Sequence, residues 1–183
     1  MNPSLTDTPT LSRRGLLQLS FGASAFLVTV GLGASLSGCS SGEPARGLAA
    51  LRDSDLPFLR AVIPAMLDGA TTAGTRLVAT DATLQSLDRG LAHLSPAMLK
   101  LTRQLFDVLT LGVTRGPLTG IWGAWENASA DDIRQFLSRW ENSSLSLLRQ
   151  GHGSLLQMVM MAWYSRPESW AHCGYPGPPL ISS

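Results

Sequence analysis

The sequence predicts an all-α fold, a single small bundle of about five helices that ends in an irregular C-terminal arm rich in Pro and Gly. Along most of the chain after residue 50, apolar residues recur at the three- and four-residue spacing of one helix face. No segment shows the sustained alternation of a half-buried strand, and no longer period indicates a repeat array. Cap residues and prolines divide the apolar stretches into lengths typical of helices.

The first 38 residues predict an export signal rather than part of the fold. Arg13 and Arg14 precede an apolar run diluted by Gly, Ala and Ser, and Leu-Ser-Gly-Cys ends this run at Cys39. The pattern resembles a bacterial twin-arginine (Tat) leader with a lipoprotein cleavage box, in which the Cys39 sulfur carries the lipid. The alternative is a permanent transmembrane anchor, because the run is long enough to cross a bilayer. Its glycines and serines, however, weaken partitioning into the membrane.

The predicted organisation of the chain has four parts. Residues 1–38 form the signal peptide, residues 39–50 a lipidated tether, residues 51–166 the helical domain and residues 167–183 an extended C-terminal arm. The tether begins as a spacer rich in Ser, Gly, Pro and Glu that has no periodicity. It is therefore expected to separate a lipid anchor from the helical domain.

The first predicted helix begins at Asp53 or Ser54, either of which can cap it. Pro57 falls in the first turn, where proline is tolerated. Pro64 should kink or split the helix, because a proline removes a backbone hydrogen bond and clashes with the preceding turn. Asp-Gly at 68–69 ends it.

The second and third predicted helices also follow cap signals. Thr80 caps the second helix, and Ser95-Pro96 is a strong signal for the start of the third. The third helix has a wide apolar stripe, which predicts burial on more than one side and makes it the candidate central helix. The stripe consists of Met98, Leu99, Leu101, Leu105, Phe106, Val108, Leu109, Gly112 and Val113.

A break in the helical pattern is predicted at residues 116–120, which contain two glycines and a proline. Trp122 and Trp125 follow in a glycine-rich corner, where large rings can pack onto closely approaching backbone. Ser129 then opens a fourth helix, and a fifth starts at the serine pair 143–144.

The C-terminal arm is predicted to leave the helical pattern at about Arg166, because Gly and Pro crowd its last part. A segment rich in aromatic side chains and stiffened by prolines suits docking onto a neighbouring surface at low entropic cost. The alternative is an arm folded back over its own helices, and both can hold. The residues expected to contact a partner are Trp122, Trp125, Trp170, Cys173, Tyr175, Pro176, Pro178 and Pro179.

The residues after Cys39 contain no motif for haem, zinc, iron–sulfur or phosphate binding. His93, His152 and His172 lack the neighbours that a metal site or a catalytic relay needs, so we interpret them as surface or packing residues. Cys173 is an odd thiol once Cys39 is lipidated, and it is either buried and inert or paired with a cysteine of another chain. The chain has 14 basic and 13 acidic side chains, a balance that gives no reason to expect a nucleic-acid partner.

Three features of the sequence occur together. They are the twin-arginine leader, the helix 56–64 with the sequence Leu-Pro-Phe-Leu-Arg-Ala-Val-Ile-Pro, and Trp170 followed by Gly-Tyr-Pro-Gly-Pro-Pro at 174–179. This combination resembles the small subunits of bacterial membrane-associated dehydrogenases, namely the gluconate 2-dehydrogenase subunit 3 group and the small subunits of flavin-dependent sorbitol and glucose dehydrogenases. The resemblance implies a non-catalytic subunit needed for the export and maturation of a large FAD subunit of the glucose-methanol-choline (GMC) type. A cytochrome c subunit often completes such complexes.

The expected function is therefore that of an accessory subunit with no catalytic, cofactor-binding or metal-binding residues of its own. It would escort a leaderless flavin dehydrogenase through the Tat translocase and stay bound to it on the periplasmic side of the envelope, anchored by its lipid. The alternative is a stand-alone periplasmic lipoprotein that acts as a structural or interaction module. An enzyme would require histidine and carboxylate side chains to meet in one pocket.

Overall fold

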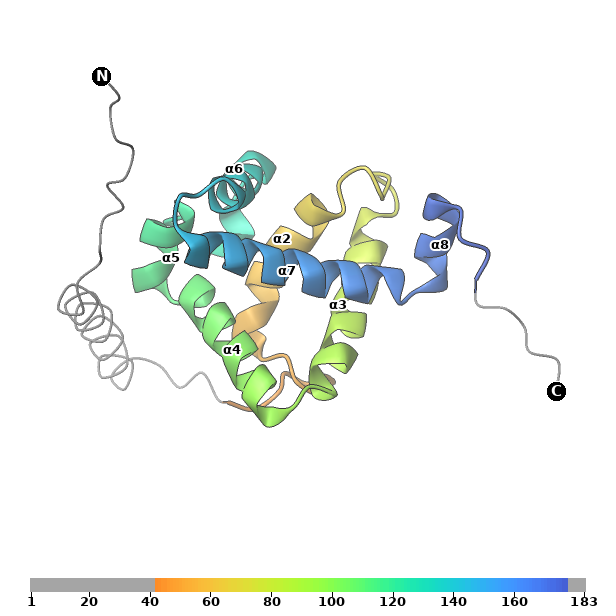
Figure 1. Ribbon diagram of the computed structural model, residues 1–183, viewed down its shortest axis with the longest axis horizontal. Helices are drawn as coiled ribbons and strands as arrows, with labels where there is room; N and C mark the ends of the chain where they lie inside the picture. The colour runs from red at the N-terminus through yellow and green to blue at the C-terminus, as the bar shows by residue number, and fades with distance from the viewer. Residues whose placement is uncertain (1–41, 178–183) are drawn as a thin grey trace, which may run out of the picture. The chain divides into compact units, whose positions relative to one another are not determined.

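The computed structural model describes residues 42–177 (Figure 1). Within this range the chain forms seven α-helices, two 3-10 helices and no strand, which confirms the all-α prediction. The elements are η1 (Asp53–Asp55), α2 (Leu56–Met66), α3 (Arg76–Ala92), α4 (Pro96–Thr110), α5 (Gly112–Thr119), η2 (Trp125–Asn127), α6 (Ala130–Glu141), α7 (Ser146–Tyr164) and α8 (Pro167–Cys173). The predictions for Arg13, Arg14, Cys39, Pro178 and Pro179 lie outside the described residues.

α2 is the central helix of the bundle and contacts α3, α6, α7 and η2 (Figure 1). Pro57 lies in its first turn, as predicted. Pro64 does not split the helix, because it stands in the last turn, where little of the hydrogen-bond ladder remains to be lost. The fully buried side chains of α2 are Phe58, Leu59, Val62 and Ile63.

The third predicted helix is in fact two helices. The chain turns between α4 and α5 at Leu111, whose backbone is extended with φ −65° and ψ 126°. Only Phe106 and Leu109 of α4 are buried, so this helix lies at the edge of the bundle and the prediction of a central third helix is wrong. The break predicted at 116–120 is also wrong, since this stretch stays helical up to a final glycine with φ 77°.

Of the five predicted helix starts, those at Ser95 and Ser129 are confirmed. Ser95 caps α4 by accepting a backbone N–H of the first turn. At the start of α6, the Ser129 N–H donates to the Asp132 carboxylate at 3.0 Å, and the Asp132 N–H donates to the Ser129 hydroxyl at 3.1 Å.

α2 begins at Leu56 with Asp55 at its N-cap rather than Asp53 or Ser54, and α7 begins at Ser146 rather than at the serine pair 143–144. α3 begins at Arg76 rather than at Thr80. Thr80 is buried inside the helix and donates its hydroxyl to the Arg76 carbonyl at 2.7 Å.

Five aromatic rings form a continuous series of contacts through the core. Neighbouring rings meet at tilted or edge-to-face angles, with centroids 5.1 to 5.9 Å apart. Such geometry is favourable for aromatic pairs and adds to the stability that comes from burial. The series joins α4, α2, η2 and α6 through Phe106, Phe58, Trp125, Phe136 and Trp140.

Both ends of the described chain differ from the predictions. Residues 45–50, expected to belong to the tether, pack against the body with Ala45 and Ala50 buried, next to the buried Leu51. The arm is not extended directly after α7, because α8 follows with Pro167 at its start, a position that proline favours. Gly174, with φ 70°, comes directly after this helix. The helix count thus rises from about five to seven, through the division of the third helix and the addition of α8.

Candidate functional site

Trp122 is the most prominent exposed aromatic side chain of the body. It lies in the loop between α5 and η2, and 76% of its surface is accessible. The ring is seated on Gly116 of α5, where an added Cβ would come within 2.5 Å of Trp122 Cε3. Only a glycine allows the ring to approach the helix backbone so closely. Trp122 therefore presents a supported ring to solvent.

Trp125, only three residues after Trp122, is buried rather than exposed. It is 3% exposed, and its Nε1 donates to the Leu109 carbonyl oxygen at 3.0 Å. Its ring meets Phe58 at 5.1 Å and Phe136 at 5.9 Å between centroids. The prediction that Trp125 contacts a partner is wrong, because the ring is a central part of the core.

Trp170 and Tyr175 form a small aromatic unit at the C-terminal end. Their centroids lie 5.4 Å apart at 75°, and the Tyr175 N–H donates to the Trp170 carbonyl at 3.0 Å. Trp170 Nε1 donates to the Tyr164 carbonyl of α7 at 3.0 Å. Gly177 lies against the Trp170 ring, with φ 99°. Residues 174–177 thus fold back on α8, while Tyr175 remains 47% exposed.

Cys173 and Pro176 are also exposed at this end of the molecule. The Cys173 thiol donates to the Trp170 carbonyl at 3.3 Å. The interpretation of Cys173 as a buried, inert thiol is therefore wrong. With Trp170 and Tyr175, these residues form what we call the C-terminal aromatic unit.

The outer face of α4 is an apolar surface that the sequence pattern predicted to be buried. Met98 and Leu101 are 51% and 59% exposed, and Leu105 and Val108 are half-buried. Their spacing of three, four and three residues places these four side chains on one stripe. The wide apolar pattern of this helix had predicted burial on two sides, but within the described chain only the side with Phe106 is covered.

The described histidines do not meet carboxylates. His93 Nδ1 lies 2.7 Å from the Arg89 carbonyl oxygen of its own helix, and His152 is half-buried on α7. Among the described side chains, which do not include that of His172, no three His, Cys, Asp or Glu are grouped so as to hold a metal ion. Between residues 42 and 177, no helix has the length and apolar character needed to cross a membrane.

A shallow cavity of about 570 Å³ opens between the start of α2, η2 and α6. Its charged side chains are Asp53, Arg60 and Glu126, and no histidine or cysteine lines it. Arg60 lies 3.5 Å from Asp81 on α3, so its charge already has a partner. The described lining therefore presents no nucleophile activated by a neighbouring base. The complete lining is Asp53, Leu56, Pro57, Arg60, Ala61, Trp125, Glu126, Ala128, Ala130 and Ile133.

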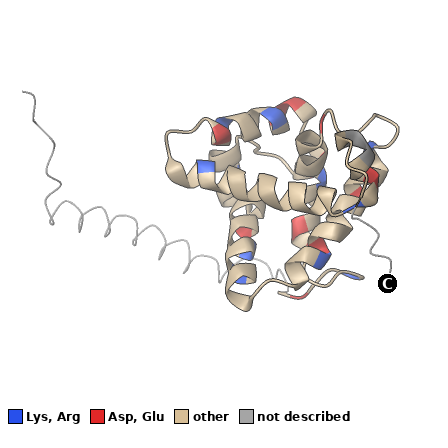
Figure 2. Cartoon of the chain, turned by 45° about the vertical axis from the view of Figure 1, so that its right-hand side comes forward, with Lys and Arg blue, Asp and Glu red and all other residues tan. Residues whose placement is uncertain are grey.

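The candidate site is thus a set of three exposed surfaces: Trp122, the C-terminal aromatic unit and the outer face of α4. Charges of both signs are scattered over the body, and Arg149 is the only Lys, Arg, Asp or Glu of α7 (Figure 2). Exposed aromatic and apolar side chains of this kind are typical of surfaces that bind other proteins. Comparison of the chain with protein-family models, curated proteins and solved structures gave no match.

Proposed function

We propose that this chain is a non-catalytic accessory subunit that escorts a leaderless GMC-type flavin oxidoreductase through the Tat pathway and stays bound to it at the membrane. The partner holds the FAD, and a cytochrome c subunit is a further member of the complex. Lipid on Cys39 anchors the complex on the periplasmic side of the envelope. The proposal combines the export signal at the start of the sequence with the aromatic surfaces of the body.

The observation that carries the proposal is the exposure of a supported Trp122 ring. Tryptophan is enriched among the residues that dominate binding energy, because its large rigid ring buries much area and has few rotatable bonds. Since the ring already rests on Gly116, a partner that covers its free face would restrict it little further. Val113 is 80% exposed and lies one turn before Gly116 on α5, which adds apolar area beside the ring.

Purification of the tagged full-length chain from its native host tests the proposal. We expect a yellow flavoprotein to co-purify with the wild type and with Leu77→Ala, a control at a side chain that is 80% exposed on α3. Trp122→Ala should lower recovery of the flavoprotein about tenfold or more, the loss typical of an interface hot spot. Deletion of residues 174–183 should lower it as well.

The competing function, a stand-alone lipoprotein, predicts a different result. The chain would then purify as a colourless monomer and would still reach the periplasm after its neighbouring genes are deleted. Equal flavoprotein recovery with Trp122→Ala and Leu77→Ala would contradict the contact assigned to Trp122. Circular dichroism of both variants would establish that the body remains folded.

A further inference from the structure

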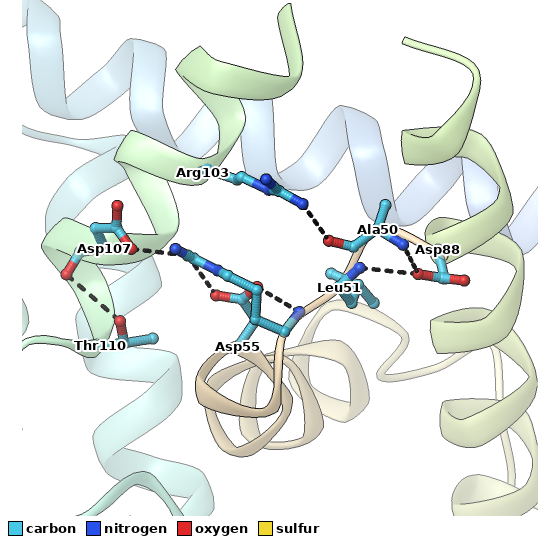
Figure 3. Close-up of polar contacts among 8 residues, drawn as sticks. Ala50, Leu51, Asp55, Asp88, Arg103, Asp107 and Thr110 are labelled. Carbon is cyan, nitrogen blue, oxygen red and sulfur yellow. Dashed lines mark hydrogen bonds and ion pairs between the residues drawn. The ribbon is translucent and has the colours of Figure 1, made fainter. Parts of the chain in front are cut away.

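The segment that leads into the body from residue 45 is held by side chains of two helices (Figure 3). Asp88 of α3 accepts the backbone N–H groups of residues 49, 50 and 51 at 2.8, 2.9 and 2.9 Å. Arg103 of α4 donates to the Ala50 carbonyl oxygen at 3.1 Å. These hydrogen bonds to residues 49–51 can therefore all form only when α3 and α4 are both packed in place.

Arg52, at the end of the segment, makes a second attachment to α4. Its buried guanidinium donates to Asp55 at 2.8 and 3.0 Å, and its Nη2 lies 2.7 Å from the Asp107 carboxylate. The hydrogen bonds to Asp55 raise the pKa of Arg52, while burial opposes this shift and Asp107 reinforces it. A buried charge is stable only while its partners stay in position. The Arg52 contacts therefore also depend on the packing of α4 against η1.

The segment contributes aliphatic but no aromatic side chains to the core. Leu51 is fully buried, Ala45 and Ala50 are buried, and Leu48 packs partly buried against the core, whereas the aromatic series lies in α2, α4, η2 and α6. Hydrogen bonds to Asp88, Arg103 and Asp55 hold its backbone. Units with few buried apolar contacts open at a lower free energy than the core of the same protein.

We propose that residues 45–52 are a releasable latch, which docks only when α3 and α4 have packed together and which sets the length of chain between Cys39 and the body. With the latch docked, residues 40–44 span at most about 18 Å, at roughly 3.5 Å per residue. With the latch released, residues 40–52 span up to about 45 Å. Release of the latch thus adds residues 45–52 to the length of chain that is free of the body. The inference rests on the body's own residues, whether or not the proposed partner exists.

Native-state hydrogen exchange of the full chain at low denaturant concentrations tests the latch. The N–H groups of residues 49–51 should exchange through an opening that depends weakly on denaturant, well before the core amides of α2 exchange. Asp88→Asn should speed their exchange about tenfold or more, because one backbone N–H then faces an NH₂ donor and the charge is lost. Asp81→Asn, an exposed position on the same helix, should leave all these rates unchanged.

Limited trypsin digestion gives an independent readout. Arg46 is exposed and should be cleaved at similar rates in the wild type and in Asp88→Asn. Arg52 is buried, so cleavage after it requires release of the latch and should rise in the variant. Asp107→Asn, which removes a half-exposed partner of Arg52, provides the same test if Asp88→Asn does not fold.

Two results would overturn the inference. In one, the N–H groups of residues 49–51 of the wild type exchange only through global unfolding, with the denaturant dependence of the core. In the other, folded Asp88→Asn or Asp107→Asn protects Arg52 from trypsin as well as the wild type does. Neither result bears on whether a flavoprotein co-purifies, so the latch and the proposed function can fail separately.

Discussion

Single glycines decide where two of the tryptophan rings can lie. A Cβ on Gly116 would come within 2.5 Å of the Trp122 ring, and a Cβ on Gly151 within 2.6 Å of the Trp140 ring. Trp122 is exposed and can swing away, whereas Trp140 is 2% exposed and its Nε1 donates to a backbone carbonyl at 2.8 Å. A Cβ added at Gly116 is therefore expected to displace the Trp122 ring, whereas one added at Gly151 should strain the packing of Trp140.

Replacing the two glycines of α7 should change stability in opposite directions. Gly151→Ala should lower the free energy of unfolding by about 1–3 kcal/mol, because Trp140 has no room to move. Gly153→Ala should raise it by about 0.5–1 kcal/mol, because no neighbour lies within 4 Å of the new Cβ and alanine favours a helix. Urea denaturation of the two variants measures both changes. A gain in stability with Gly151→Ala would show that Trp140 is not held in place.

Gly116→Ala should displace Trp122 without unfolding the body. The ring must leave the helix surface, and because it is exposed, the free energy of unfolding should change by less than about 1 kcal/mol. The indole N–H resonance of Trp122 should shift, while the resonances of Trp125 and Trp140 stay in place. An unchanged Trp122 resonance would contradict the seating of the ring on Gly116.

The cap of α6 should weaken in acid. Hydrogen bonds from the Ser129 hydroxyl and backbone N–H lower the pKa of Asp132 below its ordinary value of 3.8. A lowered pKa means that this stabilisation is complete above the ordinary value and is lost as the pH falls through the folded-state pKa. A carboxyl NMR titration should show this lower midpoint, and Ser129→Ala should raise it toward the ordinary value. A midpoint that is the same in both proteins would refute the role of Ser129.

At the scale of elements, the position of a helix end depends on local cap signals. Which face of a helix is buried depends instead on the elements that pack against it. Ser95 and Ser129 act within the next three residues, so their positions in the sequence suffice to place the starts of α4 and α6. α8 was missed because the glycines and prolines of the arm suggested an extended path, yet apart from Pro167 at the start of α8 they all follow Cys173. The end of α8 is secured by contacts that no local pattern encodes, such as the bond from Trp170 to the Tyr164 carbonyl.

Trp170→Ala should release the end of the arm. The variant loses the ring that Tyr175 and Gly177 contact and the indole bond to α7, so the Tyr175 N–H should exchange faster. An aromatic pair of this kind contributes about 0.5–1.5 kcal/mol, which corresponds to roughly a two- to tenfold faster exchange. Tyr175→Phe keeps the ring and should leave the exchange unchanged. Equal exchange rates of the Tyr175 N–H in Trp170→Ala and the wild type would show that the arm is held by other contacts.

At the scale of the whole described body, stability depends on α2, whereas the proposed function depends on the outer surfaces. The aromatic series and the buried side chains of α2 form one core. Met98, Leu101 and Trp122 stand outside it and remain exposed in the described chain. Substitutions in the core are therefore expected to change the stability of the body, whereas substitutions at the exposed side chains are expected to change the binding of a partner.

Phe58→Ala and Leu101→Ala should differ strongly in their effect on folding. Phe58 is fully buried between Phe106 and Trp125, so its truncation should cost about 3–5 kcal/mol. Leu101 is 59% exposed, and its truncation should change stability by no more than about 0.5 kcal/mol. Thermal unfolding of the two variants gives the comparison. A large loss of stability with Leu101→Ala would mean that the outer face of α4 is covered in the purified protein.

The sequence by itself determined the helical class of the body and those helix starts that carry a cap and its partner within one turn. It also named Trp122 and Tyr175 as residues expected to contact a partner, and the structure leaves both side chains exposed. Only the tertiary structure decided that α2 is central, that Trp125 is core and that one face of α4 is left uncovered. The physical reason is that burial depends on which surfaces meet across the fold, and these contacts join residues far apart in the chain.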